Sequence, residues 1–391
     1  MTAGPLLYLI AGEPSGDRLG GTLIAALRRE RPELRFAGLG GPEMAAAGLA
    51  PLFDYRDLAV MGLAEILPRL PTMIRRLRET TRDVLSRQPA ALITIDNPGF
   101  TLRVAERVRA KAPHITTIHY VAPSVWAWRP ERARHMARYI DHVLALLPFE
   151  PPYMEAVGMT CDFVGHPVTE RPAPDPAAVA ALRTGPGPHL LIAPGSRRGE
   201  VRRLGPVLRE VAQRLRDRDA GLTVTIPVAE TVATEVEAMF APLSPRFLRP
   251  EEGPEAKAAA MAAADAAAVA SGTVTLEMAA AGTPHVSCYR TSWLTAAMVR
   301  RLVKVDTAHL VNLVVGRHTV PECLQEACTP DRVLAALTPL LSGGEAAAAQ
   351  RSDFRVALAA LGADGPPPST RAARSVLHVM DAPLRRHQTV T

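Results

Sequence analysis

The chain of 391 residues is short of aromatic residues, lysine, cysteine and long apolar runs. Only 4% of it is aromatic, and its basic charge comes from 42 arginines and three lysines spread along the chain, without the clustered run typical of nucleic-acid binding. Its four cysteines have no paired ligand spacing, so we expect ordinary thiols and no zinc site.

No window of about 20 residues is free of charges and helix breakers, which excludes a membrane-spanning helix. Without the basic start of a signal peptide, the sequence predicts a soluble cytoplasmic protein.

The chain does contain enough apolar sequence for two domains. Hydrophobic residues make up 48% and charged residues 21%, which excludes global disorder, and 391 residues are too many for one ordinary domain. The formal net charge is +6. Such a balance suits an anionic partner, either a phosphorylated ligand or an acidic membrane surface, and we expect no nucleic-acid partner.

Short apolar runs alternate with longer helical stretches in both halves, which predicts an α/β fold of parallel sheets. In the first half the predicted strands are residues 5–11, 34–38, 90–95, 115–120, 142–146 and 161–164. In the second half they are residues 189–193, 222–227 and 266–270. We therefore predict two doubly wound, Rossmann-like domains, residues 1–166 and 189–362, facing a central cleft. Proline and glycine mark residues 167–188 as a linker, and residues 363–391 form a tail whose helix is expected to pack back on the first domain.

The turn GEPSGD follows the first predicted strand and opens a helix. Its small residues Ser15 and Gly16 let a ligand approach the backbone, and the helix start offers unpaired N–H groups. The carboxylates of Glu13 and Asp17 would repel a pyrophosphate, which disfavours a dinucleotide site. The turn is therefore either part of a first-domain site or a tight turn in which Ser15 or Asp17 caps the helix.

Two further features of the first half lie at predicted strand ends. Asp96 ends a strand, and ligands of parallel sheets lie beyond the carboxyl ends of the strands. Its carboxylate is placed to act as a base or, equally, to cap the next helix. The stretch from His119 to Trp128 holds two tryptophans and is followed by arginines. Trp126 in this stretch either contacts a sugar or phosphate or belongs to a packed loop.

In the second half, two turns each connect a strand to a helix. Ser196 and Arg197 form one of them, and a guanidinium pairs bidentately with phosphate oxygens. The turn Ser271–Thr273 would present backbone N–H groups to phosphate, and Glu277 is placed to accept hydrogen bonds from ribose. Together the turns favour a nucleotide-diphosphate site over bare helix caps. The D-x-D string at 217–219 lies at a charged helix end, so we expect no metal site.

Residues 60–77 form a basic amphipathic stretch. Arginines interleave its apolar residues, as in segments that rest on an anionic membrane. The apolar positions at helical spacing are Leu63, Ile66, Leu67, Leu70, Met73, Ile74 and Leu77. Pro68 and Pro71 are expected to interrupt any single long helix. We favour a membrane or acyl-chain role for this stretch over packing on the first sheet.

Eight strings within residues 8–330 together resemble one family. They are GEPSGD at 12–17, IDNPGF at 95–100, IHYVAPSVWAWR at 118–129, LALLPFEPPYM at 144–154, FVGHP at 163–167, PGSRRGEV at 194–201, SGTVTLEMA at 271–279 and VNLVVGRHTVPECLQE at 311–326. In this order they resemble the lipid-A-disaccharide synthases, inverting glycosyltransferases of the two-domain GT-B type. The tryptophan-containing string is the most specific of them.

The resemblance implies condensation of UDP-2,3-diacylglucosamine with 2,3-diacylglucosamine 1-phosphate. The product is the β(1→6)-linked lipid A disaccharide 1-phosphate, with release of UDP and without metal or other cofactor. It also implies a cytoplasmic enzyme attached peripherally to the inner leaflet of the inner membrane. Asp96 is the expected base, and the first-domain site residues are Glu13, Ser15, Gly16, Asp17 and Trp126. The expected UDP-binding residues are Ser196, Arg197, Glu200, Ser271, Gly272, Thr273, Glu277, Asn312 and Gln325.

Two other functions compete with this one. The first is another GT-B enzyme that uses a UDP-sugar, such as a UDP-N-acetylglucosamine 2-epimerase. The second is a non-catalytic protein that binds a nucleotide or a membrane, against which Asp96 at a strand end argues. The sequence leaves acyl chain length and oligomeric state open.

Overall fold

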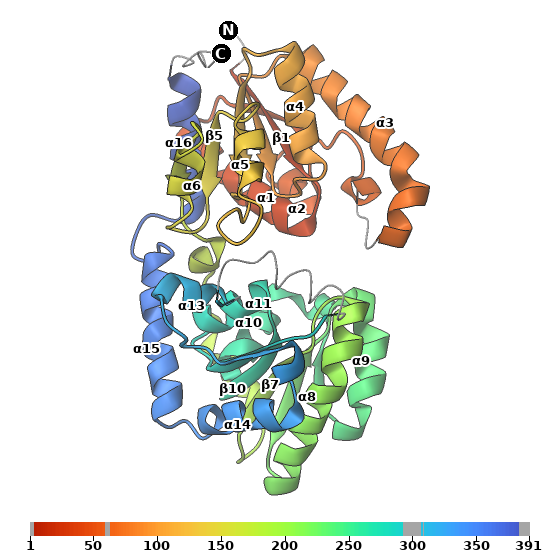
Figure 1. Ribbon diagram of the computed structural model, residues 1–391, viewed down its shortest axis with the longest axis vertical. Coiled ribbons are helices and arrows are strands. Elements are labelled where there is room, and N and C mark those ends of the chain that lie inside the picture. Colours follow the sequence, from red (N-terminus) through yellow and green to blue (C-terminus); the bar gives the residue numbers. More distant parts are fainter. Residues whose placement is uncertain (1–3, 59–62, 292–305, 308, 383–391) are drawn as a thin grey trace. The chain divides into compact units, whose positions relative to one another are not determined.

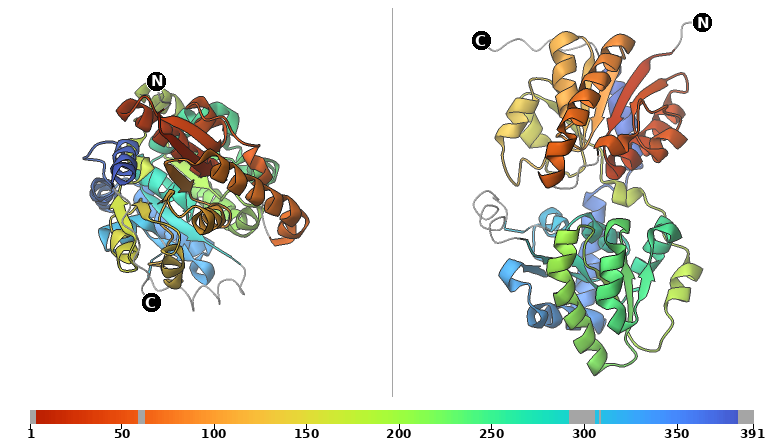
Figure 2. Two further views of the ribbon diagram at one scale, coloured as in Figure 1. Left: turned by 90° about the horizontal axis from the view of Figure 1, so that it is seen from above. Right: turned by 90° about the vertical axis from the view of Figure 1, so that its right-hand side faces the viewer.

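The computed structural model describes residues 4–58, 63–291, 306–307 and 309–382, and of residues 63–69 the backbone only. The chain divides into two compact units (Figures 1 and 2). Unit 1 comprises residues 1–170 and 361–391, and unit 2 comprises residues 171–360.

Unit 1 is built on a parallel sheet of six strands in the order β2-β1-β3-β4-β5-β6. The strands are β1 (Leu6–Ala11), β2 (Arg35–Leu39), β3 (Ala91–Ile95), β4 (Thr116–Tyr120), β5 (His142–Ala145) and β6 (Thr160–Phe163). The helices are α1 (Pro14–Glu30), α2 (Pro42–Ala46), α3 (Leu63–Arg87), α4 (Thr101–Lys111), α5 (Glu131–Met136), α6 (Pro151–Glu155) and α16 (Pro368–Asp381). The strand order reverses between β1 and β3, so the loops that follow these two strands lie side by side.

Apolar side chains cover both faces of this sheet, which explains why its strands are continuous apolar runs. Along β1, Leu7 and Leu9 join the core cluster on one face, while Tyr8 and Ile10 join the cluster on the other. All four are fully buried. Both faces of β1 are therefore packed in the core of unit 1.

Helix α16 comes from the end of the chain and completes unit 1. Its residues Ala372 and Val376 are buried in the same cluster as Leu7, and it packs along α1 (Figure 1). At its start, Glu170 accepts hydrogen bonds from the backbone and hydroxyl of Ser369. The N-terminal unit therefore depends on a helix that follows unit 2 in the chain.

Unit 2 repeats the plan with a parallel sheet in the order β12-β11-β10-β7-β8-β9. Its strands are β7 (His189–Ala193), β8 (Thr223–Pro227), β9 (Arg246–Leu248), β10 (Ala266–Ala270), β11 (His285–Tyr289) and β12 (Glu322–Leu324). Its helices are α7 (Pro176–Leu182), α8 (Arg198–Arg218), α9 (Ala233–Phe240), α10 (Gly253–Ala263), α11 (Thr273–Ala280), α13 (Leu310–Val315), α14 (Pro330–Leu341) and α15 (Glu345–Ala360). The order reverses between β7 and β10. The predicted α/β fold with two Rossmann-like sheets is confirmed.

One detail differs from the sequence expectations. Helix α3 runs through Pro68 and Pro71, so the expected interruption is wrong. A proline removes one backbone hydrogen bond, but it does not end a helix that packing stabilises further along. Helix α3 is anchored beyond the prolines by the buried Leu77 and Val84. Within residues 167–188 the short helix α7 is capped by Asp175 and packs on α10 of unit 2.

Candidate active site

The loops that follow β1 and β3 in unit 1 meet at the point where the strand order reverses. A Cβ atom on Gly12, which follows β1, would lie 2.8 Å from Nδ2 of Asn97, which follows β3. A Cβ on Gly16 would lie 3.3 Å from the carbonyl oxygen of Ile95. Glycine at these positions lets the first turn of α1 approach the loop that carries Asp96.

Asp96 lies on strained backbone beside its neighbour Asn97. Their φ angles are +47° and +41°, in the left-handed region that few non-glycine residues adopt. The Asp96 N–H donates to the carbonyl of Tyr120 at 3.0 Å, and the Asp96 carbonyl accepts from the Thr101 hydroxyl at 2.6 Å. Helix α4 has Phe100 as its N-cap residue and no side-chain cap, so Asp96 does not cap it. Its half-buried carboxylate is held at the strand end by the main chain.

Asp17 stabilises the neighbouring helix rather than its own. Its carboxylate is buried and accepts hydrogen bonds from the N–H groups of Gly41, Glu43 and Met44 at 2.7–3.0 Å. These are the first N–H groups of α2, which would otherwise be unpaired. The structure thus gives Asp17 a capping role on α2, which the sequence did not predict, whereas Glu13 and Ser15 are exposed at the start of α1.

Trp126 is tied to a buried carboxylate. Its indole Nε1–H donates to Glu150 at 3.3 Å, and its ring meets Phe149 edge to face with centroids 5.2 Å apart. Trp128 is contacted by the guanidinium groups of Arg129 and Arg132. Sequence reasoning did not single out Glu150, which lies in the string LALLPFEPPYM after β5.

In unit 2, the two predicted phosphate-binding turns lie next to each other. Val269 near the end of β10 pairs with Ala193 at the end of β7, so the turns that follow these strands share one edge of the sheet. Gly272, at φ 151°, is the N-cap residue of α11, and no described side chain caps that helix. A Cβ on Gly272 would meet no atom of the described residues within 4 Å. Among the described residues, the first N–H groups of α11 therefore have no side-chain cap, which is typical of a helix start that binds an anion.

The other turn is held by Glu200. Its carboxylate accepts from the Ser196 N–H at 3.2 Å and from the Arg197 guanidinium at 3.0 Å. Gly195, at φ 113°, makes room for it, because a Cβ there would lie 2.7 Å from a Glu200 oxygen. Arg197 is largely exposed, so its guanidinium is available to a phosphate.

Glu277 and Asn312 are already engaged within unit 2. Burial alone would raise the pKa of Glu277, but Lys257 at 2.6 Å and Arg171 at 2.8 Å lower it below its ordinary value. Asn312 is buried, and its amide bonds the Val320 main chain in both directions. Asn312 therefore orders the loop that follows α13.

Gln325 lies at the end of β12, at a φ of +52°, and its side-chain oxygen accepts from the Thr291 N–H at 3.1 Å. It therefore joins the loops after β11 and β12. Among the described residues, no group of three or more His, Cys, Asp or Glu side chains is arranged to hold a metal ion.

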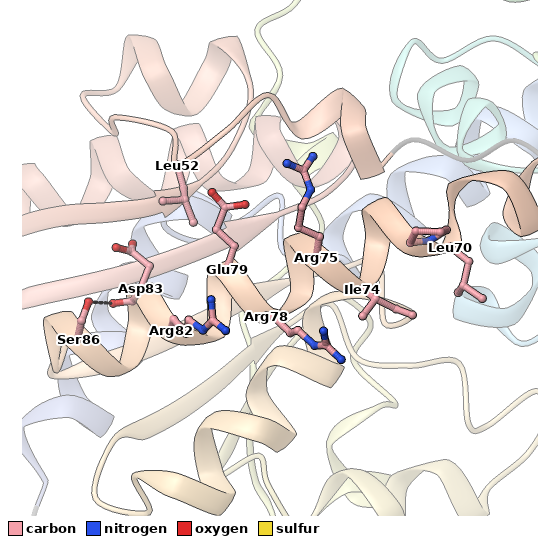
Figure 3. A pocket seen from close by; sticks show the side chains of 10 residues that line it. Leu52, Leu70, Ile74, Arg75, Arg78, Glu79, Arg82, Asp83 and Ser86 are labelled. Carbon is pink, nitrogen blue, oxygen red and sulfur yellow. Dashed lines mark hydrogen bonds between the residues drawn. The ribbon is translucent and has the colours of Figure 1, made fainter.

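A groove of about 1030 Å³ follows α3 in unit 1 from Leu70, in the amphipathic stretch, to Ser86 (Figure 3). Leu70 and Ile74 are exposed at one end of it, and Arg75, Arg78 and Arg82 follow along the helix. Among the described residues none of these three arginines has an ion-pair partner. The side chains of Leu63, Ile66 and Leu67 lie outside the described residues, as does Val60. No helix of the described chain has the length and apolarity needed to cross a bilayer.

Solved structures share this fold. A UDP-N-acetylglucosamine 2-epimerase from Neisseria meningitidis bound to UDP-GlcNAc matches with a TM-score of 0.61 and 11% identity, covering 96% of this chain and 99% of that one. CalG4, the calicheamicin glycosyltransferase, matches with a TM-score of 0.58 and 17% identity, covering 96% and 98%. The fold is that of two-domain GT-B glycosyltransferases and related epimerases.

Sequence relatives define the family. The family model described as lipid-A-disaccharide synthetase matches residues 7–363. The lipid-A-disaccharide synthase of Ruegeria pomeroyi is 50% identical over 95% of this chain and 94% of its own length. That of Rhodospirillum centenum is 47% identical over 96% and 94%. The chain belongs to the lipid-A-disaccharide synthase family and is a glycosyltransferase of lipid A biosynthesis. The predicted function is confirmed, and the competing epimerase is not favoured.

Proposed function

We propose that the protein transfers the sugar of UDP-2,3-diacylglucosamine to 2,3-diacylglucosamine 1-phosphate with inversion and without a metal ion. Asp96 takes the proton from the 6-hydroxyl of the acceptor as this oxygen attacks the anomeric carbon. The C–O bond to UDP breaks at the same time, and UDP leaves with the bonding electrons. The observation that carries the proposal is Asp96 on its strained strand end, not used as a cap of α4. Glu13 is the alternative base.

Unit 2 binds the leaving diphosphate in this proposal. No described side chain caps the start of α11, and Arg197 adds an exposed positive charge at the Ser196 turn. Glu277 accepts from the ribose hydroxyls, since its lowered pKa keeps it ionised. The UDP-GlcNAc carried by the epimerase of the same fold supports a UDP-sugar donor. Asn312 and Gln325 position the neighbouring loops.

The test is release of UDP from the two acylated substrates in the presence of a chelator. We expect full turnover in EDTA, because main-chain N–H groups and Arg197 replace a cation. Restoration of lost activity by Mg²⁺ or Mn²⁺ would refute the metal-free mechanism. Formation of an α-linked product would refute inversion.

The substrates carry acyl chains, and we propose that α3 brings the enzyme to the inner leaflet of the inner membrane as a peripheral protein. Leu70 and Ile74 enter the interface, and Arg75, Arg78 and Arg82 meet anionic headgroups (Figure 3). Each arginine contributes about 1 kcal/mol near such a surface, so binding is reversible and sensitive to salt.

Replacing Leu70, Met73 and Ile74 with Ser tests this attachment. We expect loss of co-sedimentation with vesicles that contain anionic phospholipid, at an unchanged melting temperature. Val356→Ser, an exposed apolar residue on α15, is the matched control and should keep vesicle binding. A fall in melting temperature in the triple variant would instead show that these side chains belong to the core.

A further inference from the structure

Glu150 is a buried carboxylate that the mechanism above does not use. It is 3% exposed and follows β5. The N–H groups of Leu146 and Leu147 donate to its Oε2 at 3.1 and 3.0 Å, and the indole of Trp126 donates to its Oε1 at 3.3 Å. Burial raises the pKa of Glu150 to about 7. All three partners are donors, so they fit the ionised carboxylate, which only accepts.

These contacts belong to the same sheet edge as Asp96. The Asp96 N–H donates to the carbonyl of Tyr120 on β4, and the Val121 N–H donates to the carbonyl of Leu144 on β5, both at 3.0 Å. Val121 has a φ of +83°, which is rare for a β-branched residue. The strand ends of β3, β4 and β5 are thus linked, and Glu150 joins the last of them to Trp126.

We propose that Glu150 is a positioning residue for the acceptor sugar phosphate. Its carboxylate fixes the indole of Trp126 and the main chain of residues 146–147, and so shapes the wall beside Asp96. The inference rests on the proposed function, because Trp126 must line the acceptor side of the site. Exchange of the carboxylate for an amide places an NH₂ group against an N–H donor, so the indole or the loop must move.

The titratable and charged groups on the elements around Glu150 either have pKa values shifted away from 7 or are exposed to solvent. They are Arg129, His142 on β5, Tyr153 and Glu155 on α6, and Cys161 and Asp162 on β6. Burial raises the pKa of the Cys161 thiol and lowers that of His142, and Glu155 is exposed. A transition near pH 7 that is sensed by Trp126 is therefore assigned to Glu150.

The test compares Glu150→Gln with Glu155→Gln, an exposed neighbour on α6, in the full-length protein. In Glu150→Gln we expect the KM for the acceptor to rise about tenfold, because roughly one charge-assisted hydrogen bond is lost. The KM for the donor should be unchanged. In the wild type we expect kcat/KM for the acceptor to rise as Glu150 ionises near pH 7. This rise should disappear in the variant. In a background with Trp128→Phe and Trp293→Phe, the fluorescence of Trp126 should titrate near pH 7 only when Glu150 is present.

A double-mutant cycle with Trp126→Phe separates positioning from general stability. If Glu150 acts through the indole, Glu150→Gln adds less than about twofold to the acceptor KM in the Trp126→Phe background. An unchanged acceptor KM, or equal rises in both KM values with a lower melting temperature, overturns the proposal. Absence of UDP release by the wild type would overturn the proposed function instead, since the fluorescence titration reads the Glu150–Trp126 contact without turnover.

Discussion

The loops at the strand-order reversal have left-handed backbone in both units, but the residues that adopt it are of different types in unit 1 and unit 2. In unit 1 these residues are Asp96 and Asn97, which bear polar side chains. In unit 2 they are Gly195 and Gly272, which bear none. The same strand-loop-helix plan therefore presents side chains at one edge and main-chain N–H groups at the other.

The difference follows from what each edge is proposed to bind. A proton acceptor must be a side chain, so strain of about 1–3 kcal/mol at a non-glycine residue is tolerated there. A diphosphate is larger and is held by several N–H groups, so glycine serves best because a Cβ would stand between ligand and backbone. Each of the following predictions tests one side of this difference.

Asp96→Asn should have the largest effect. Loss of a general base lowers turnover by about 10²–10⁴-fold, while UDP binding, which is assigned to unit 2, is unchanged. Turnover is measured as UDP release and binding by calorimetry. Asp364→Asn, at an exposed position near the start of the tail, is the control and should be fully active. Activity of Asp96→Asn within a few-fold of wild type would transfer the role of base to Glu13.

Acidification should lower the stability of unit 2 more than that of unit 1. Burial lowers the pKa of His285 to about 4 and that of His309 to about 2, and these side chains touch through their Nε2 atoms at 3.0 Å. As pH falls from 7 to 5, the unfolded chain takes up protons at the ordinary pKa of about 6.5 and folded unit 2 does not. Each histidine therefore removes about 2 kcal/mol of stability at pH 5.

In unit 1 Glu150 opposes the buried His119 and His142, whose pKa values are lowered by burial, over the same pH range. Burial lowers the pKa of His119 to about 4, which removes stability, and raises that of Glu150 to about 7, which restores it as the folded state binds a proton first. We expect unit 2 to open before unit 1 at pH 5, measured by hydrogen exchange with mass spectrometry. Glu150→Gln should abolish most of the difference. Earlier opening of unit 1 in the wild type would contradict this balance.

Arg197→Ala tests the side-chain contribution at the unit 2 edge. The loss of a charged hydrogen bond to phosphate costs about 1.5–3 kcal/mol, so UDP should bind roughly 10–150-fold more weakly. Arg218→Ala, at the exposed other end of α8, removes the same charge and should leave affinity unchanged. Equal losses in both variants would mean that net charge alone attracts the nucleotide.

Gly272→Ala should have the smallest effect. A Cβ at this position meets no described atom within 4 Å, so in the free protein the change acts through the φ of 151°. Strain of about 1 kcal/mol shifts the N–H groups of α11 and weakens UDP binding roughly fivefold. Gly343→Ala, at φ 72° with equally open surroundings, should lose similar stability but keep its affinity. Unaltered UDP binding by Gly272→Ala would remove α11 from the site.

The features that sequence could predict are local ones. Asp96 and the turns at Ser196 and Ser271 each follow a buried apolar strand and precede a helix, and this pattern is visible within about ten residues. The order of strands is not local. Nothing near Ser196 or Ser271 indicates that β7 and β10 are neighbours, which is what brings the two turns together.

What sequence missed depends on distant partners. Strands β9 and β12 have three residues each and exist only because a longer strand pairs with them. Asp17 caps a helix that begins 25 positions later, and Glu150 is defined by the indole of Trp126, 24 positions earlier. Helix α3 passes through its prolines because residues after them are anchored, which the local proline rule does not include.

The return of the chain to unit 1 through α16 has a consequence for synthesis on the ribosome. Unit 2 is continuous in the sequence, so it can reach its native fold as soon as residues 171–360 have emerged. Unit 1 begins to emerge first but stays incomplete, with the cluster that receives Ala372 and Val376 uncovered, until those residues follow. The usual order of folding along a nascent chain is thereby reversed, and the unit that is made first is finished last.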